Sequence, residues 1–325
     1  MQGVTEKALE LLASGKVQRV LGWRAGEFFY DLTPAVFESA EEVQKDFQYG
    51  AFAGANLSKY CIAESKKDGV TAVFLKPCDT YSFVQLLKEY KIKRENVYIV
   101  GVQCSGMCDM EVIRAHGISG ATAVEECGGD LKISTLYGEE TMKKADALLL
   151  KCKTCKSKKL VIFDELLGEQ GEDCLESHRF DEVSRLEALS PEERFSFWRG
   201  ELSRCIRCNA CRNVCPACTC ETCVFDNHSL GTDNKAAASD FEENFFHIIR
   251  AFHVTSRCTD CGECSRVCPQ HIPLHLLNRK FIKDTNELYG AYQAGAELDS
   301  RPPLLDFRTD DCEPSVIYER GGAKG

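Results

Sequence analysis

The segments CIRCNACRNVCP at residues 205–216 and CTDCGECSRVCP at residues 258–269 decide how this chain is organised. Both carry the same pattern. Two residues separate the first cysteine from the second and the second from the third, three residues separate the third from the fourth, and a proline follows the fourth. Three thiolates on one tight turn can bind three corners of a 4Fe-4S cube, and the fourth iron takes its ligand from the other copy. The spacing therefore predicts two clusters with crossed ligand sets, namely Cys205, Cys208 and Cys211 with Cys268, and Cys258, Cys261 and Cys264 with Cys215.

Zinc is the alternative occupant, but it prefers a site built from two separated cysteine pairs and has no use for the final cysteine and proline. Cys215 and Cys258 are 43 positions apart, more than a compact ferredoxin needs. The intervening segment places aromatic and aliphatic residues at helical spacing, at Phe241, Phe245, Ile248, Ile249 and Phe252. We therefore expect residues 201–285 to form a mainly helical, ferredoxin-like domain with two 4Fe-4S clusters, in which this apolar helix packs across the clusters.

Residues 1–165 show a different pattern, typical of an α/β domain. Short apolar runs at 71–76 and 97–102 indicate buried strands, and the helical spacing of residues 80–90 lies between them. Strand, helix and strand in succession predict parallel strands. A further strand is expected at 161–163. An acidic helical connector at 166–200 and an extended tail at 286–325 complete the predicted domain organisation.

Four cysteines of the N-terminal domain indicate a third metal site. Cys78 and Cys104 each follow a predicted strand, at the edge of a parallel sheet where such folds place their sites. Cys152 and Cys155 form a pair within a lysine-rich stretch whose charge would offset that of bound thiolates. These four residues are expected to hold a third 4Fe-4S cluster, although a redox-active cysteine pair, a zinc site and plain buried thiols remain open.

The other cysteines have less certain roles. Cys108 or Cys127 could replace one of the four ligands of the third site. The residues Cys218, Cys220 and Cys223 follow the first motif and could be thiols beside a cluster, a small metal site or packing groups. Three further cysteines stand alone in the sequence, and each is expected to be a small buried hydrophobic residue. They are Cys61, Cys174 and Cys312.

Composition narrows the class of protein. The chain has 325 residues, 20 of them cysteine, and a formal net charge of -10. The first residues lack the basic start and following apolar stretch that indicate a signal peptide, so a cytoplasmic, thiol-reducing compartment is expected. In such a compartment many cysteines indicate metal or redox chemistry. The negative charge argues against nucleic acid as a partner, and the apolar runs are too short for membrane insertion.

Three N-terminal motifs resemble those of the beta-subunit family of deazaflavin-dependent hydrogenases and formate dehydrogenases. They are Lys76-Pro77-Cys78-Asp79, Gly101-Val102-Gln103-Cys104-Ser105-Gly106, and Cys152-Lys153-Thr154-Cys155 ahead of Asp164-Glu165-Leu166-Leu167-Gly168. The cysteine-dense part is similar to iron-sulfur subunits of formate dehydrogenase and heterodisulfide-reductase-type complexes. The resemblance implies a flavin, normally FAD, that exchanges hydride with a soluble carrier.

The expected function is that of an iron-sulfur electron-transfer subunit in an anaerobic oxidoreductase complex. It would relay single electrons between a catalytic oxidoreductase subunit and a second redox subunit, without a catalytic residue of its own that the sequence can name. One alternative is a flavin-containing subunit that accepts hydride from NAD(P)H or a deazaflavin. The other alternative is a cluster-based redox sensor or scaffold.

Overall fold

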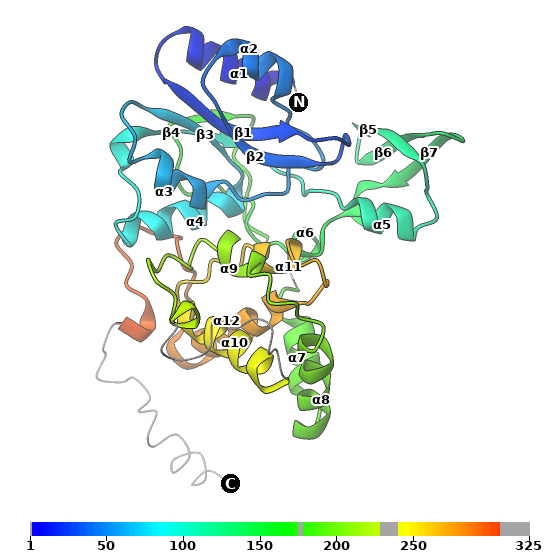
Figure 1. The fold of residues 1–325 in the computed structure, drawn as a ribbon, viewed down its shortest axis with the longest axis vertical. Helices are drawn as coiled ribbons and strands as arrows, with labels where there is room; N and C mark the ends of the chain where they lie inside the picture. The colour runs from blue at the N-terminus through cyan, green and yellow to red at the C-terminus, as the bar shows by residue number, and fades with distance from the viewer. Residues whose placement is uncertain (1, 175–177, 228–239, 306–325) are drawn as a thin grey trace.

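The computed structural model describes residues 2–174, 178–227 and 240–305. In Figure 1 the sheet-containing N-terminal part lies above a helical C-terminal part, and the short helices α6 (Leu150–Lys153) and α11 (Glu263–Arg266) meet where the two parts join. The predicted α/β domain with parallel strands is confirmed.

A five-stranded mixed sheet forms the centre of the N-terminal part. Its order is β2-β1-β3-β4-β8, with β2 antiparallel to β1 and all other neighbours parallel. The central strand is buried along its whole length, which explains its unbroken apolar sequence TAVFL. The strands are β1 (Arg19–Ala25), β2 (Leu32–Phe37), β3 (Thr71–Leu75), β4 (Val97–Val102) and β8 (Glu165–Leu167).

Helices pack against this sheet and close its hydrophobic core, in which Trp23, Phe37 and Phe74 are completely buried. Helix α4 begins with Pro77 in its first turn, and the Asp79 carboxylate accepts a hydrogen bond from the Lys76 backbone N–H at 3.3 Å. The helices of this part besides α6 are α1 (Gln2–Ala13), α2 (Ala40–Asp46), α3 (Cys61–Glu64), α4 (Pro77–Lys88) and α5 (Met110–Ala115), with 3-10 turns at Ser58–Tyr60, Arg94–Asn96 and Lys144–Ala147.

Two features of this part differ from the sequence prediction. The last strand is β8, which begins at Glu165 and not at 161. Asp164 precedes it and makes two hydrogen bonds with Ile99, because its backbone N–H donates to the Ile99 carbonyl and its side chain accepts from the Ile99 N–H. A separate antiparallel sheet was also not predicted, since its strands are short and largely exposed. It consists of β5 (Ala121–Cys127), β6 (Asp130–Thr135) and β7 (Gly138–Lys143).

The C-terminal part is helical, with two longer helices beside the cysteine motifs. Helix α10 lies between the motifs in the sequence, and α12 continues to Tyr289, inside the segment expected to be an extended tail. Among the described residues, no helix combines the length and apolar character that a membrane crossing requires. The helices are α7 (Asp181–Glu187), α8 (Pro191–Leu202), α9 (Ala210–Val214), α10 (Asp240–His253), α11 and α12 (Leu274–Tyr289), with 3-10 turns at Val224–Asp226 and Pro303–Leu305.

Candidate metal centres

The first motif and the end of the second motif share one cavity. Its walls carry all four cysteines of the first predicted ligand set, namely Cys205, Cys208, Cys211 and Cys268. Arg207 and Asn209, which stand between the first three cysteines, adopt positive φ angles of 52° and 61°. These left-handed residues form the tight turn that directs three thiols of one short segment into one space.

The second predicted set is also brought together. Burial is the main cause that raises the pKa of each of the three thiols of the second motif, and the charge of Cys215 raises all three further. Cys215 therefore lies within electrostatic range of Cys258, Cys261 and Cys264 at once. The chain thus crosses between the two motifs in the way that a two-cluster arrangement requires.

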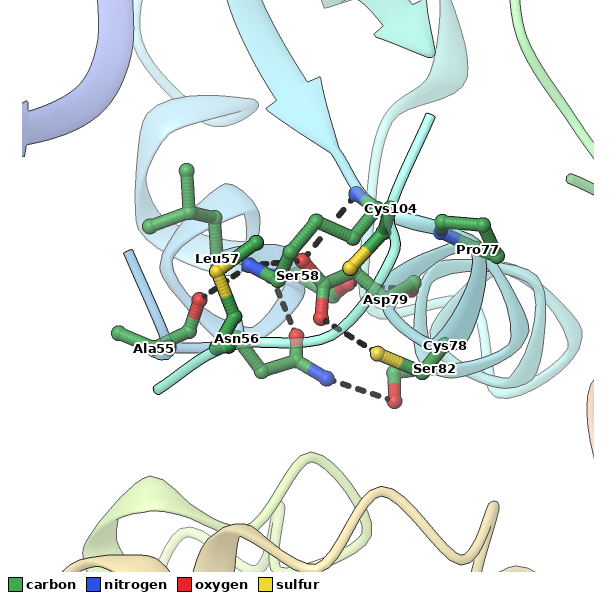
Figure 2. Close-up of polar contacts among 12 residues, drawn as sticks. Ala55, Asn56, Leu57, Ser58, Pro77, Cys78, Asp79, Ser82 and Cys104 are labelled. Carbon is green, nitrogen blue, oxygen red and sulfur yellow. Dashed lines mark hydrogen bonds and ion pairs between the residues drawn. The ribbon is translucent and has the colours of Figure 1, made fainter. Parts of the chain in front are cut away.

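A third group of four cysteines lines a cavity at the end of the large sheet. Cys78 opens helix α4 directly after β3, and Cys104 follows β4, so the two lie beside each other at one sheet edge (Figure 2). Cys152 in α6 and Cys155 just after it complete the walls of the same cavity. The two pairs lie far apart in the sequence, and the fold brings them together around one cavity.

Hydrogen-bond donors and cations surround this third group. The backbone N–H of Gly106 lies 3.4 Å from the Cys104 sulfur, and that of Met107 lies 3.4 Å from the Cys152 sulfur. Lys76, Lys151 and Lys158 line the cavity. Amide donors and positive charge stabilise thiolates, which is the environment that a bound cluster needs.

The buried network beneath Cys78 fixes its position. The Lys76 ammonium lies 2.9 Å from the Asp79 carboxylate and donates to the Ala55 carbonyl at 2.8 Å. Asn56 donates to Ser82, and Ser58 donates to the Asp79 carbonyl (Figure 2). Because these polar groups satisfy one another away from water, the first turn of α4 is held rigidly.

The thiols of the three groups are acids that metal binding must deprotonate. Burial raises the pKa of Cys78 well above its usual value, and the neighbouring charges of Asp79 and Cys155 add to this. Burial likewise raises the pKa of Cys104 and Cys211. Binding iron at these sites would therefore release protons, and the iron would supply the positive charge that the buried thiolates lack.

Among the described residues, no group of three or more His, Cys, Asp or Glu side chains is arranged to hold a single metal ion. A 4Fe-4S cube makes a different demand, because each of its four irons takes one cysteine and the thiols stand around a volume larger than one ion.

The remaining cysteines fall outside these three groups. Cys108 packs in the core of the small sheet beside Ile113, and Cys127 is exposed at the end of β5. Cys61 is buried in the main core, as expected. Cys174 is exposed, which corrects the expectation of a buried thiol, because only its backbone is tied, donating to the Lys156 carbonyl. Cys312 lies outside the described residues.

One of the cysteines that follow the first motif is in contact with a proposed ligand. Cys218 shares a hydrogen bond with Cys215, and this bond is the main cause that lowers the pKa of Cys215 to about 6 and raises that of Cys218. Cys220 is exposed and Cys223 is half-buried beside Phe225. Cys218 is thus a thiol beside a metal centre, placed to donate to the sulfur of Cys215.

Helix α10 presents a different face to the cysteines from the one its sequence predicts. Phe245, Ile248 and Phe252 of the apolar stripe are exposed, whereas Phe246, His247 and Arg250 are buried. The side chain of Phe241 lies outside the description. The physical reason is the charge of the thiolates, which favours the helix face that carries a cation and a hydrogen-bond donor.

The role of one of these buried residues, His247, was not predicted from the sequence. The His247 Nε2 lies 3.2 Å from the Cys205 sulfur, and burial, followed by Arg250 and Arg207, lowers the pKa of His247 to about 3. The imidazole is therefore neutral and can donate this hydrogen bond. The only available signal was that His247 lies on the helix between the motifs.

Arg250 is a deeply buried cation between the cysteines of the two motifs. It is 3% exposed, and none of its three guanidinium nitrogens has a hydrogen-bond partner among the described residues. Burial acts to lower its pKa, but the charges of Cys264, Cys211 and Cys215 outweigh burial and raise it. Arg250 thus faces cysteines of both groups, and its unused donors fit a site whose sulfide ions would accept them.

Comparisons with known proteins agree with this geometry. Residues 201–272 match the model of the 4Fe-4S dicluster domain. The chain is 24% identical to the F420-dependent formate dehydrogenase subunit beta of Methanocaldococcus jannaschii, over 91% of this chain and 92% of that relative. It is 25% identical to the F420-dependent formate dehydrogenase 1 subunit beta of Methanococcus maripaludis, over 91% of this chain and 90% of that relative. The resemblance indicated by the N-terminal motifs is confirmed.

One solved structure, of the F420-reducing nickel-iron hydrogenase complex from Methanosarcina barkeri, overlaps this fold in part. The TM-score is 0.40 and the identity 13%, over 62% of this chain and 84% of that chain.

Proposed function

We propose that this chain is an iron-sulfur electron-transfer subunit of an oxidoreductase complex of the formate dehydrogenase or hydrogenase type. The observation that carries the proposal is the gathering of twelve cysteines into three groups of four, two of them crossed between the repeated motifs. The named relatives are beta subunits of formate dehydrogenases, and the match extends over nearly the whole chain.

We assign one 4Fe-4S cluster to each group. The motif I cluster takes Cys205, Cys208, Cys211 and Cys268, the motif II cluster takes Cys258, Cys261, Cys264 and Cys215, and the third cluster takes Cys78, Cys104, Cys152 and Cys155. Clusters of this kind supply one-electron chemistry. The chain holds the thiolates, excludes water from them and supplies the amide, imidazole and guanidinium donors described above.

The partners proposed are a catalytic oxidoreductase subunit and a second redox subunit, because a relay needs a donor and an acceptor. The high number of cysteines outside disulfides favours a cytoplasmic, anaerobic setting. The three groups of cysteines support this role, because clusters held by them would carry electrons between the two partners.

Iron and acid-labile sulfide analysis tests the assignment directly. The chain is purified or reconstituted without oxygen, and twelve irons and twelve sulfides per chain are expected from three cubes of four irons each. Replacing Cys78 and Cys104 together by alanine should remove about four irons, whereas the same change at Cys61 and Cys174 should remove none. Fewer than eight irons in the unaltered chain would contradict the proposal.

A flavin-bearing subunit is the second candidate, and one cavity favours it. A space of about 710 Å³ lies between helix α5 and the end of the second motif, within the size range of cofactor sites. Tyr30 and Phe52 offer aromatic surface, and Arg114 and Arg266 offer positive charge. This lining fits an aromatic, phosphate-bearing group such as FAD.

The cavity also lies beside Cys268, one of the residues assigned to the motif I cluster. A bound flavin would accept hydride and pass single electrons onward, while the chain would bind its phosphates and shield its ring. Extraction of the anaerobically purified chain with acid, followed by fluorescence of the supernatant, measures flavin content. A flavin-free chain that still holds twelve irons would remove this candidate and leave the first intact.

A further inference from the structure

The second cysteine motif is fastened to the third cysteine group through the residues between its cysteines. The Thr259 hydroxyl lies 2.9 Å from that of Ser82, one turn along helix α4 from Cys78. Asp260 accepts a hydrogen bond from Arg279 at 2.7 Å, and the same guanidinium donates to Thr154 at 2.8 Å. Thr154 stands between Cys152 and Cys155.

The strongest of these attachments is a buried ion pair. Glu263, which is 0% exposed, pairs with Lys151, the residue immediately before Cys152. Its carboxylate also accepts from Arg266 at 2.8 Å and from the Asn56 backbone N–H at 3.1 Å. The contacts with Lys151 and Asn56 fix the second motif against the N-terminal part, and together with Arg266 they offset the cost of burying the charge.

At Gly262 the two backbones come together. This residue has a φ of +67°, and a Cβ atom added to it would overlap the Cβ of Lys151. Gly262 is the neighbour of Cys261 in sequence, and Lys151 is the neighbour of Cys152. Cys261 is a proposed ligand of the motif II cluster and Cys152 is one of the third cluster. The two are thus linked through the contact of Gly262 with Lys151, their neighbours in the sequence.

The first motif is attached to the N-terminal part at its other end, where the Lys59 ammonium donates to the Arg212 carbonyl at 3.2 Å, just before Cys215. At the start of the first motif, Ile206, between its first two cysteines, is 60% exposed, and Cys208 is exposed as well. The second motif therefore contacts the sheet domain through residues between its first three cysteines, whereas the contact of the first motif lies near Cys215, which is assigned to the motif II cluster.

We propose that the three clusters form a line in which the motif II cluster is central, and that electrons cross between it and the third cluster at the contact of Lys151 with Gly262. Lys151 and Glu263 are the positioning residues of this crossing. The inference rests on the proposed function. In the step, the third cluster loses one electron and the motif II cluster gains one, or the reverse, and no bond to hydrogen is made or broken.

The fixed charges at the crossing act on the clusters with opposite signs. The Lys151 ammonium lies within electrostatic range of Cys78 and Cys152, and the Glu263 carboxylate lies within range of Cys261. A positive charge favours the reduced state of a nearby cluster and a negative charge disfavours it. Removing each charge should therefore move the reduction potentials in opposite directions.

The first arm of the test establishes the order of the clusters in the intact, fully loaded chain. Reduced 4Fe-4S clusters that are neighbours split each other's electron paramagnetic resonance signals. Removing the motif II cluster with Cys258→Ala and Cys261→Ala should abolish the splitting of the third cluster. Removing the motif I cluster with Cys205→Ala and Cys208→Ala should leave that splitting in place. The reverse pattern would overturn the proposed order.

The second arm measures the midpoint potential of each cluster by redox titration. Lys151→Met should lower the potentials of the third and motif II clusters, Glu263→Gln should raise them, and both should leave the motif I cluster least changed. Lys151→Arg keeps the charge and should restore the original values. Exposed Lys45→Met and Glu192→Gln serve as matched controls without effect.

The outcomes distinguish failure of the proposed crossing from absence of the third cluster. Loss of structure in the variants would shift potentials in one common direction, and equal shifts at all three clusters, or the largest shift at the motif I cluster, would overturn the crossing. If Glu263→Gln fails to load iron, the comparison of Lys151→Met with Lys151→Arg decides alone. An unaltered chain with only eight irons would instead contradict the third cluster and with it the crossing, and would leave the proposed electron-transfer role with two clusters in place.

Discussion

At the scale of single residues, Arg250 shows how this chain balances charge. The thiolates of twelve gathered cysteines would repel one another, and a cation between two groups lowers that repulsion. Arg250 is buried within electrostatic range of Cys211 and Cys264, one from each dicluster group. One guanidinium therefore acts on two clusters at once.

Replacing Arg250 by glutamine should lower the potentials of both dicluster clusters. The expected shift is about 60–120 mV, which corresponds to one or two tenfold steps in a one-electron equilibrium. Redox titration followed by electron paramagnetic resonance measures it. Arg250→Lys, which keeps the charge, should recover most of the shift, and the exposed Arg185→Gln is the control. Unchanged potentials in Arg250→Gln would show that the charge does not act on the clusters.

His275 gives the fold a dependence on pH. Burial, followed by Arg279, lowers its pKa from 6.5 to about 4, and its Nδ1 lies 2.8 Å from the Ser265 hydroxyl. Below pH 6.5 the unfolded chain gains a proton at this residue, whereas the native chain stays neutral until near pH 4. The free energy of unfolding therefore falls as the pH drops through this window, by about 1.4 kcal/mol for this group between pH 7.5 and 5.5.

Anaerobic urea unfolding of the loaded chain at pH 7.5 and 5.5 measures this decline. His275→Asn, which can still bond to Ser265, should lose about 1.4 kcal/mol less than the unaltered chain between the two pH values. The exposed His116→Asn should show the original decline. Identical declines in all three chains would exclude His275 as the source.

At the scale of elements, the sequence predicted what is set locally and missed what depends on distant neighbours. The cysteine turns follow from spacing alone, because three ligands of one cluster lie within seven residues, as from Cys205 to Cys211. The strands β3 and β4 were found because burial on both faces makes an apolar run. The orientation of α10 could not be found, since the partner of its Arg250 face is a set of thiolates from both motifs.

The small sheet β5-β6-β7 was missed for a related reason. Its outer strands are charged and exposed, and only Leu131 and Ile133 of β6 are completely buried, against a core that includes Met110 and Ile113 of α5. Two inward positions on one strand are too few to show an alternation that stands out in the sequence. The element exists because α5 covers it.

Leu131→Ala should destabilise this element by about 2–5 kcal/mol, the cost of removing a fully buried leucine side chain. Exposed Leu136 in the turn after β6 provides the matched control, because Leu136→Ala removes the same atoms from solvent. Denaturant unfolding of both variants measures the difference, and both should keep the iron content of the unaltered chain. A loss of iron in Leu131→Ala would mean that the small sheet also supports a cluster.

At the scale of the whole molecule, the two parts differ in what stabilises them. The N-terminal part has a continuous apolar core on both faces of its sheet. The C-terminal part has smaller cores into which cysteines are built, with Cys211 and Cys264 in one and Cys215 in another. Helices α9 and α11 have five and four residues, and helices of this length are not stable by themselves. Metal binding is therefore expected to supply part of the folding free energy of this half.

Removing iron should accordingly lower the hydrogen-exchange protection of the C-terminal part and leave that of the N-terminal sheet largely unchanged. Hydrogen exchange of the anaerobic chain, before and after iron is withdrawn with an oxidant and a chelator, compares the two. Amides of α9 and α11 should lose protection by at least tenfold, while those of β1 and β3 keep it, because the core around these strands contains no proposed ligand among its fully buried members. The third cluster sharpens the expectation: Cys78 and Cys104 stand at the ends of β3 and β4, so protection should fall at these strand ends and not at their centres. Equal loss along the whole of β3 would show instead that the sheet, too, depends on its cluster.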